Sequence, residues 1–232
     1  MSLADLSVNF FVALFALIDP IGNVPVFAAA TVGATPAGRR RLALYIALFS
    51  LAFLTLIYVS GLSLLRFFGI SLSAFRIAGG LLLFLLGLDM ARNDFTARFT
   101  DPAVTANAAS LSTGAYAWER FERLVVPFAM PLLIGPGAIS TVVIYAGEAR
   151  PYGLAGFGAG LAVIAVVSGL IVPFFWTTSL ISRLLGRIGM TIVVRVLGLI
   201  LCAMAVQFII AGIGGSTHGL VRADAISPYQ QN

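Results

Sequence analysis

The apolar run from about Val8 to Val32 is interrupted at its centre by the sequence Asp19-Pro20-Ile21-Gly22-Asn23-Val24-Pro25. Proline removes a backbone hydrogen-bond donor, clashes with the preceding helical turn and disfavours helical angles in the residue before it. The run is therefore long enough to cross a bilayer, but it cannot cross as one straight helix. Non-helical backbone at membrane depth is tolerated only where protein or water satisfies the freed polar groups. We therefore expect a helix break here, with Asp19, Pro20, Gly22 and Asn23 as candidate site residues.

A second interruption lies in a later apolar segment, between Met130 and Thr141, where Gly135-Pro136-Gly137 is followed by Ser140. When Pro136 is aligned with Pro20, Gly135 falls opposite Asp19. Two interrupted apolar segments at corresponding places in two halves of a chain are the best sequence indicator of a transporter site. We predict that the two breaks lie close together near the middle of the membrane.

The composition supports a membrane location for the whole chain. Of its 232 residues, 60% are hydrophobic and only 10% are charged, whereas a soluble domain has about 25% charged residues. Met1 to Ser7 contains no basic residue, so we expect no cleaved signal peptide. We predict an all-α membrane protein in which six segments each reach the ~20 residues that a bilayer requires, over residues 8–32, 42–65, 72–91, 124–146, 153–176 and 190–213. Residues 182–187 have the spacing of a short helix on the membrane surface.

An internal repeat relates the two halves. Arg76 and Gly79 in the third segment correspond to Arg195 and Gly198 in the sixth. An odd number of spans per copy inverts the second copy relative to the first, an architecture found in many secondary transporters. We predict a first three-helix repeat over residues 1–91 and a second, inverted one over 124–213, with helices one and four broken. A polar cytoplasmic linker (92–123) joins them, and a polar tail (214–232) follows.

The distribution of arginine predicts the orientation. The linkers after segments one, three and five carry nine arginines (Arg39, Arg40, Arg41, Arg92, Arg98, Arg120, Arg123, Arg183 and Arg187), and the opposite side carries three (Arg66, Arg150 and Arg222). Cytoplasmic loops carry the excess of basic residues. We therefore expect the first group in the cytoplasm and both termini outside.

The two breaks offer complementary chemistry. Asp19 before Pro20 resembles an N-cap before the first helical position, and Gly135 and Pro136 can play the same roles. Helix N-termini carry partial positive charge and suit a carboxylate, while carbonyl groups freed just before each break can accept from an ammonium group. Donors, acceptors and one acid fit a small zwitterion.

Structural roles for the same residues remain open at this stage. Asp19 can serve only as a cap, and Asn23 only as a structural hydrogen-bonding group. An ionisable residue inside a membrane is nevertheless a functional candidate by default. The glycines of segments three and six are interpreted mainly as close-packing positions between helices; these are Gly79, Gly80, Gly87 and Gly198.

Other classes of protein fit less well. With one histidine and one cysteine, the chain lacks the usual ligands of a metal site and the base of a serine hydrolase, so we assign no catalytic residue, no metal and no cofactor. The arginines form no basic face for nucleic acid. No ring of charges or filter-like sequence indicates a channel, although a pore made by an oligomer stays open as an alternative.

The motifs from Phe10 to Thr31, from Met130 to Thr141 and from Phe75 to Gly80 resemble those of the MarC family of bacterial inner-membrane proteins. The resemblance implies six helices in two inverted repeats and, for some members, transport of small neutral amino acids such as glycine and alanine. We accordingly expect a secondary transporter of such a solute in the bacterial inner membrane, bound by Asp19, Pro20, Gly22, Asn23, Gly135, Pro136, Gly137 and Ser140. A coupling H⁺ or Na⁺ and a homo-oligomer are compatible with the sequence. Transport of another small metabolite is the alternative.

Overall fold

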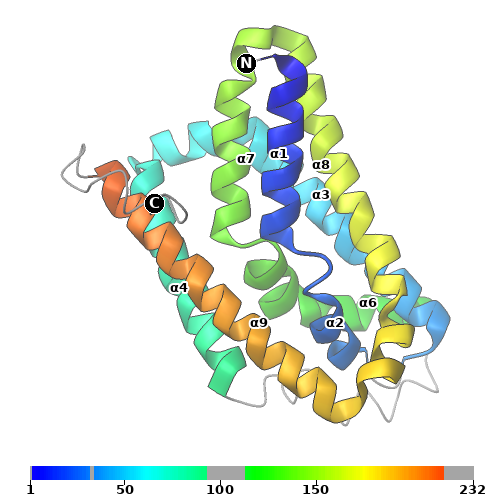
Figure 1. The fold of residues 1–232 in the computed structure, drawn as a ribbon. Helices are drawn as coiled ribbons and strands as arrows, with labels where there is room; N and C mark the ends of the chain where they lie inside the picture. Colours follow the sequence, from blue (N-terminus) through cyan, green and yellow to red (C-terminus); the bar gives the residue numbers. More distant parts are fainter. Residues whose placement is uncertain (1, 32–33, 93–112, 217–232) are drawn as a thin grey trace.

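The structure, a computed structural model, describes residues 2–31, 34–92 and 113–216, and these residues form helices and turns without a strand (Figure 1). This agrees with the predicted all-α class. In chain order the elements are α1 (Leu3–Ile18), α2 (Val24–Ala30), α3 (Pro36–Phe67), α4 (Leu72–Arg92), α6 (Thr113–Leu124), the π-helix η2 (Val125–Leu133), α7 (Pro136–Glu148), the 3-10 turn η3 (Arg150–Tyr152), α8 (Gly153–Trp176) and α9 (Thr178–Ser216).

Within the described residues, four helices are long and apolar enough to cross a membrane. The spans that qualify are 21 to 27 residues long and lie at Pro36–Gly61, Leu72–Arg92, Arg150–Trp176 and Thr191–Ser216. They correspond to predicted segments two, three, five and six. Predicted segments one and four are each divided, into α1 with α2 and into η2 with α7, as the proline and glycine motifs predicted.

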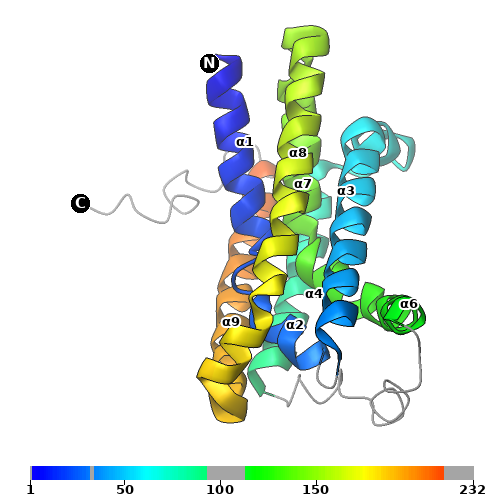
Figure 2. The same ribbon diagram turned by 90° about the vertical axis from the view of Figure 1, so that its right-hand side faces the viewer.

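Successive connections alternate between the two ends of the molecule. The N-terminus of α1 and the α3–α4 and α7–α8 connections lie towards one end, whereas α6 and the start of α9 lie at the other (Figure 1). The view in Figure 2 shows α6 projecting sideways there, across the direction of the long helices. Trp118 lies on this helix, and its side chain is exposed.

Helix α9 is kinked near its beginning. Gly186 has φ 60° and ψ −172°, a conformation that is readily adopted only by glycine. The residues before it form a separate short piece of helix, as the spacing of residues 182–187 predicted. The polar tail after Ser216 and most of the central linker (93–112) lie outside the described residues.

Helix α4 packs along the second half of α9 (Figure 1). A Cβ atom added at Gly87 would lie 2.7 Å from the carbonyl oxygen of Gly198, and one at Gly198 would lie 2.7 Å from that of Gly87. The same seam repeats every seven residues, because Gly80 faces Ala205 and Gly212 faces Ser73. Small side chains let two helix backbones approach closely, so the packing role expected for Gly80, Gly87 and Gly198 is confirmed.

Gly79 has different neighbours from Gly198, its partner in the predicted repeat. A Cβ atom at Gly79 would overlap the ring of Pro136 on α7, whereas Gly198 contacts α4. The arginine and glycine spacing that suggested the repeat therefore does not place these two glycines in equivalent surroundings. Their shared feature is close packing alone.

Candidate functional site at the two helix breaks

Asp19 ends α1 and forms the first corner of the break. It is the only non-glycine residue of the described chain with positive φ, at 42°, and its backbone N–H still donates to the carbonyl of Phe15. Its side-chain Oδ1 accepts from the N–H of Gly22 at 2.9 Å. Aspartate tolerates this left-handed conformation better than most residues because its short side chain bonds locally. A side chain at Gly22 would overlap the Asp19 carboxylate.

Asn23 closes the break from the other side. Its Nδ2 donates to the carbonyl oxygens of both Ile18 and Asp19, each at 3.0 Å, and the residue is only 7% exposed. These carbonyls are among the groups that a helix end leaves without partners. Asn23 therefore has the structural role that the sequence left open, and the Ile18 carbonyl that we expected to be free is occupied.

The assignment of Asp19 as the N-cap of a half-helix is wrong. Asp19 is the C-cap of α1, and the following half-helix, α2, begins four residues later than predicted, at Val24. The reason is the left-handed turn at Asp19, which places Pro20 in a loop instead of a first helical turn. With seven residues, α2 is also too short to develop the dipole of a full helix.

The second break has the predicted geometry. Gly135 is the N-cap of α7 with extended backbone (φ −79°, ψ 171°), and Pro136 is the first helical position. The π-helix η2 precedes this break and has wider turns than an α-helix. Its last backbone hydrogen bond runs from the Ile134 N–H to the Ala129 carbonyl, at 3.0 Å. Glycine offers no capping side chain, and no other side chain caps this helix start. The buried N-terminus of α7 therefore keeps backbone donors without a side-chain acceptor.

The two breaks lie close together. A Cβ atom at Gly137 would lie 3.2 Å from Cδ2 of Leu17, in the last turn of α1, and would overlap the ring of Phe208 on α9. In Figure 1, α1 ends and α7 begins at mid-height of the molecule. Leu17 and Phe208 thus cover the start of α7 on the side that faces the first break.

A small cavity lies beside the first break. Its volume is about 20 Å³, enough for about one water molecule and too small for an amino acid. It is lined by Leu17, Asp19, Gly22, Asn23, Met90, Leu132, Leu197, Ile200, Leu201 and Met204. Asp19 is partly accessible, and among the described residues its Oδ2 has no hydrogen-bond partner.

The candidate residues are therefore only partly brought together. Asp19, Gly22 and Asn23 line the cavity, whereas Gly135, Pro136, Gly137 and Ser140 do not. Pro136 packs on Gly79, and Gly137 is covered by Phe208. The Ser140 hydroxyl is buried without a hydrogen-bond partner in the described part of the chain. Pro20 is buried within the loop.

Aromatic side chains close the region on the side of α2. Phe27 stacks on Phe175 with ring centroids 4.3 Å apart, and Phe128 lies within 6.2 Å of both rings. All three side chains are fully buried. They join α2, η2 and α8 below the cavity.

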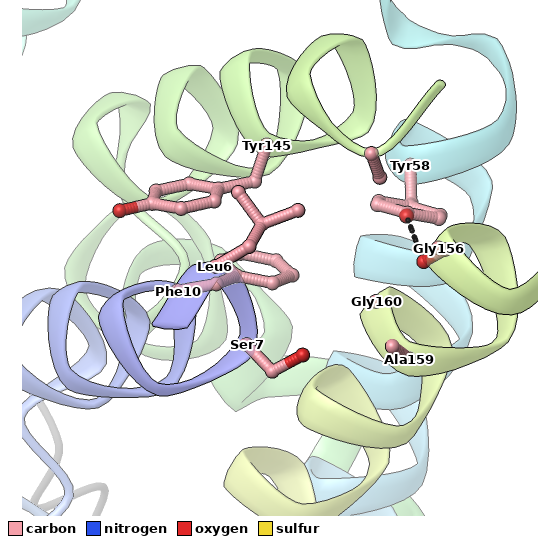
Figure 3. Close-up of a pocket in the computed structure, with 9 residues that line it drawn as sticks. Leu6, Ser7, Phe10, Tyr58, Tyr145, Gly156, Ala159 and Gly160 are labelled. Carbon is pink, nitrogen blue, oxygen red and sulfur yellow. Dashed lines mark hydrogen bonds between the residues drawn. The ribbon is translucent and has the colours of Figure 1, made fainter. Parts of the chain in front are cut away.

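A second aromatic group closes the side nearer the N-terminus. Phe10 stacks on Tyr145 at 4.7 Å and lies 6.3 Å from the ring of Tyr58, and the Tyr58 hydroxyl donates to the Gly156 carbonyl at 3.4 Å (Figure 3). The space left between these residues is about 10 Å³. The two breaks therefore lie between two packed aromatic layers.

Comparison with known proteins agrees with this architecture. The model of the MarC family integral membrane proteins matches residues 5–217. The chain belongs to the MarC family. A similar relative is a UPF0056 membrane protein of Methanocaldococcus jannaschii, 36% identical over 208 residues, which cover 89% of this chain and 95% of that protein. The UPF0056 membrane proteins YvbG of Bacillus subtilis and YhcE of Escherichia coli are both 33% identical, over 90% and 92% of this chain and 94% of each relative. No solved structure matches the chain.

This MarC family member also contains a site residue that the sequence reasoning missed. Arg120 of α6 is only 4% exposed, and its Nε donates to the carbonyl of Ala30 at 2.8 Å. Arg39 donates to the next carbonyl, that of Thr31, at 3.3 Å. The two guanidinium groups therefore bind carbonyls at the C-terminal end of α2, which a helix end leaves without partners. The spacing of the buried residues Tyr116, Ala117, Arg120 and Leu124 is the signal that could have placed Arg120 on the buried face of α6.

Proposed function

We propose that this MarC family member is a secondary transporter of a small neutral amino acid such as glycine or alanine, which it binds between the two helix breaks. One observation carries the proposal. The partly accessible Asp19 carboxylate lines the same cavity as Leu17, and a Cβ atom at Gly137, in the first turn of the uncapped helix α7, would lie 3.2 Å from Cδ2 of Leu17. An acceptor and a set of donors therefore lie near the same side chain.

This arrangement suits a zwitterion. The free Oδ2 of Asp19 would accept from the substrate ammonium group, in a charge-assisted hydrogen bond. The backbone donors of α7 at Gly137 and Ala138 would bind the carboxylate, as helix N-termini bind anions. The cavity beside Asp19, of about 20 Å³, favours a substrate with a very small side chain.

Binding requires a change from the conformation described here. The cavity of about 20 Å³ has to join the space at Gly137, which calls for Leu17 and Phe208 to turn away. Opening towards the side of the N-terminus would then separate the rings around Phe10. Opening towards the opposite side would separate the rings around Phe27. A transporter with alternating access needs this pair of closures around a central site.

The arrangement of the helices supports an inverted repeat. Helix α4 packs on α9 and α3 packs on α8, which pairs the second and third members of each predicted three-helix unit, and the divided segments α1–α2 and η2–α7 are the first members. We place the protein in the bacterial inner membrane with both termini in the periplasm, because nine arginines lie in the linkers after segments one, three and five and three lie on the opposite side.

Neither an enzyme nor a nucleic-acid partner is part of the proposal. The partners are the bilayer and the solute, with H⁺ or Na⁺ as the coupling ion and a homo-oligomer as an assembly compatible with it. The alternative is a family member that moves another small metabolite, or a channel. The polar groups gathered at a closed cavity favour a carrier over an open pore.

Uptake into proteoliposomes tests this function. Purified protein would be reconstituted and offered a panel of labelled amino acids, with and without H⁺ and Na⁺ gradients. We expect saturable uptake of glycine and alanine that exceeds uptake of leucine, lysine and glutamate. Flux that does not saturate would indicate a channel, and the absence of flux for every amino acid would overturn the proposed substrate class.

A further inference from the structure

A groove lies between the beginning of α3 and the end of α8, well away from the helix breaks. Its volume is about 500 Å³, and it is lined by Pro36, Ala37, Arg40, Arg41, Leu44 and Trp176. The start of α3 and the end of α8 lie together at the edge of the molecule (Figure 1). The groove is open to the surroundings, unlike the cavity at Asp19.

The three consecutive arginines at this helix start have different roles. Arg39 turns inward and donates to the Thr31 carbonyl, whereas the side chains of Arg40 and Arg41 are exposed. Among the described residues, no acidic side chain pairs with either of them. Two guanidinium groups without a carboxylate partner therefore face the same groove.

Trp176 fixes one wall of this groove. The guanidinium carbon of Arg40 lies 5.3 Å from the centre of the Trp176 ring, within the range of a cation–π interaction. The indole is 49% exposed, so about half of its surface is free for contact. Tryptophan is enriched at the level of the lipid headgroups, where its ring is in apolar surroundings on one side and polar surroundings on the other.

The depth of the groove in the membrane follows from the spans. One apolar span begins at Pro36 and another ends at Trp176, so the groove lies where the hydrocarbon meets the headgroup region. Leu44 and Leu48 continue from it along the same face of α3, at 44% and 51% exposure. A ligand here would meet two cations at one end and apolar side chains at the other.

We infer that this groove binds an anionic phospholipid, with its phosphate on Arg40 and Arg41 and an acyl chain along Leu44 and Leu48. Arginine binds phosphate through paired N–H donors, and basic pockets at the ends of transmembrane helices bind lipid headgroups. The site does not depend on the proposed transport function or on which side of the membrane the groove faces.

Tryptophan quenching by brominated lipids tests the site. The chain has two tryptophans, so Trp118→Phe leaves Trp176 as the single tryptophan. Phosphatidylglycerol with brominated acyl chains would be titrated into the full-length protein in detergent, beside brominated phosphatidylcholine. We expect saturable quenching with phosphatidylglycerol only, and glycerol phosphate without acyl chains should compete poorly.

Three variants separate this site from general lipid contact. Arg40→Gln with Arg41→Gln should weaken phosphatidylglycerol binding about 30-fold, since each arginine near an anionic surface contributes about fivefold. Arg66→Gln removes one arginine at the other end of α3 and should have no effect. If the double Gln variant folds poorly, Arg40→Lys with Arg41→Lys is measured as well. It keeps both positive charges and should retain most of the binding. Equal quenching by both lipids, or unchanged binding in a folded double Gln variant, would overturn the inference, and tight binding of glycerol phosphate alone would assign the groove to a soluble phosphate ester.

Discussion

Asn23 Nδ2 lies 3.0 Å from the carbonyl oxygen of Ile18, and this bond joins the end of one helix to the start of the next across the break. The same nitrogen donates to the Asp19 carbonyl. In the bilayer interior no water replaces such a donor. The bend of the first segment therefore depends on one amide group that only asparagine or glutamine could supply.

Asn23→Asp should destabilise the protein more than Asn23→Ala. Alanine leaves two carbonyl oxygens without this donor, at a cost of about 1–3 kcal/mol. Aspartate adds a carboxylate oxygen that faces the same two carbonyls, so repulsion is added to the loss. Thermal unfolding in one detergent would measure the order.

Asn23→Gln is the matched control, because glutamine keeps an amide donor for the two carbonyls. We expect it to lose less stability than Asn23→Asp. If Asn23→Asp were as stable as Asn23→Gln, the amide would not hold the break.

Gly87→Ala should separate α4 from α9. Its new methyl group would lie 2.7 Å from the Gly198 carbonyl oxygen and 2.9 Å from the backbone nitrogen of Cys202, and a neighbouring backbone cannot move aside as a side chain can. We expect a loss of about 1–3 kcal/mol by overpacking, measured as a lower unfolding temperature.

Gly169→Ala provides the comparison for the seam. A Cβ atom there meets nothing within 4 Å, so the higher helix propensity of alanine should leave stability unchanged or raise it by up to about 1 kcal/mol. Equal effects of the two substitutions would mean that helix propensity, and not close approach, decides the outcome at Gly87.

Arg120→Gln should loosen α2. The substitution removes the buried cation that donates to the Ala30 carbonyl at 2.8 Å, and a hydrogen bond to a charged group contributes about 1.5–3 kcal/mol. Amide hydrogen exchange in residues 24–30 should rise together with a fall in thermal stability.

Arg123→Gln is the control on the same helix. Arg123 pairs with Glu119 at 3.1 Å, but both side chains are more than 40% exposed, and exposed pairs contribute little. We expect no change in exchange of α2. A similar increase in both variants would show that α6 as a whole, and not Arg120, stabilises the half-helix.

The arginine distribution makes a prediction about topology. Reporter fusions at Val104 should give a cytoplasmic signal, and fusions at Asn232 should give an external one, because nine arginines lie on the first side and three on the other. The measurement is the paired activity of a cytoplasmic and a periplasmic reporter at each position. The reverse pattern would invert the orientation that we propose.

Local chemistry explains why both breaks could be predicted from the sequence. Proline destabilises a helix interior in any surroundings, because it removes a hydrogen bond and clashes with the preceding turn. Pro20 and Pro136 therefore locate the breaks without knowledge of packing. The N-cap at Gly135 follows from the same local rule. The identities of the apolar spans follow from length and hydropathy.

The remainder of the site depends on contacts between distant parts of the chain. The left-handed backbone at Asp19 decides that this residue caps α1 and not α2, and nothing in the Asp19-Pro20 sequence alone specifies that conformation. The covering of Gly137 by Phe208, about 70 residues away in the sequence, depends on the packing of α7 against α9. No periodicity within a single helix carries that information.

The proposed function depends most directly on the Asp19 carboxylate. Asp19→Asn should preserve the fold, because asparagine also adopts the left-handed conformation and its Oδ1 can accept from the Gly22 N–H as the carboxylate does. Asp19→Gly permits the same backbone but removes the side chain. Transport should fall in both variants, whereas thermal stability should fall mainly in the second.

The most direct measurement is counterflow of labelled alanine in proteoliposomes, with the wild type and Asp19→Asn prepared in the same lipid and matched for folded protein. The account predicts rapid counterflow by the wild type and a reduction of about tenfold or more in the variant, because a charge-assisted hydrogen bond to the ammonium group becomes a neutral one of roughly half the strength. Full counterflow by Asp19→Asn would contradict it and leave the carboxylate as a helix cap alone.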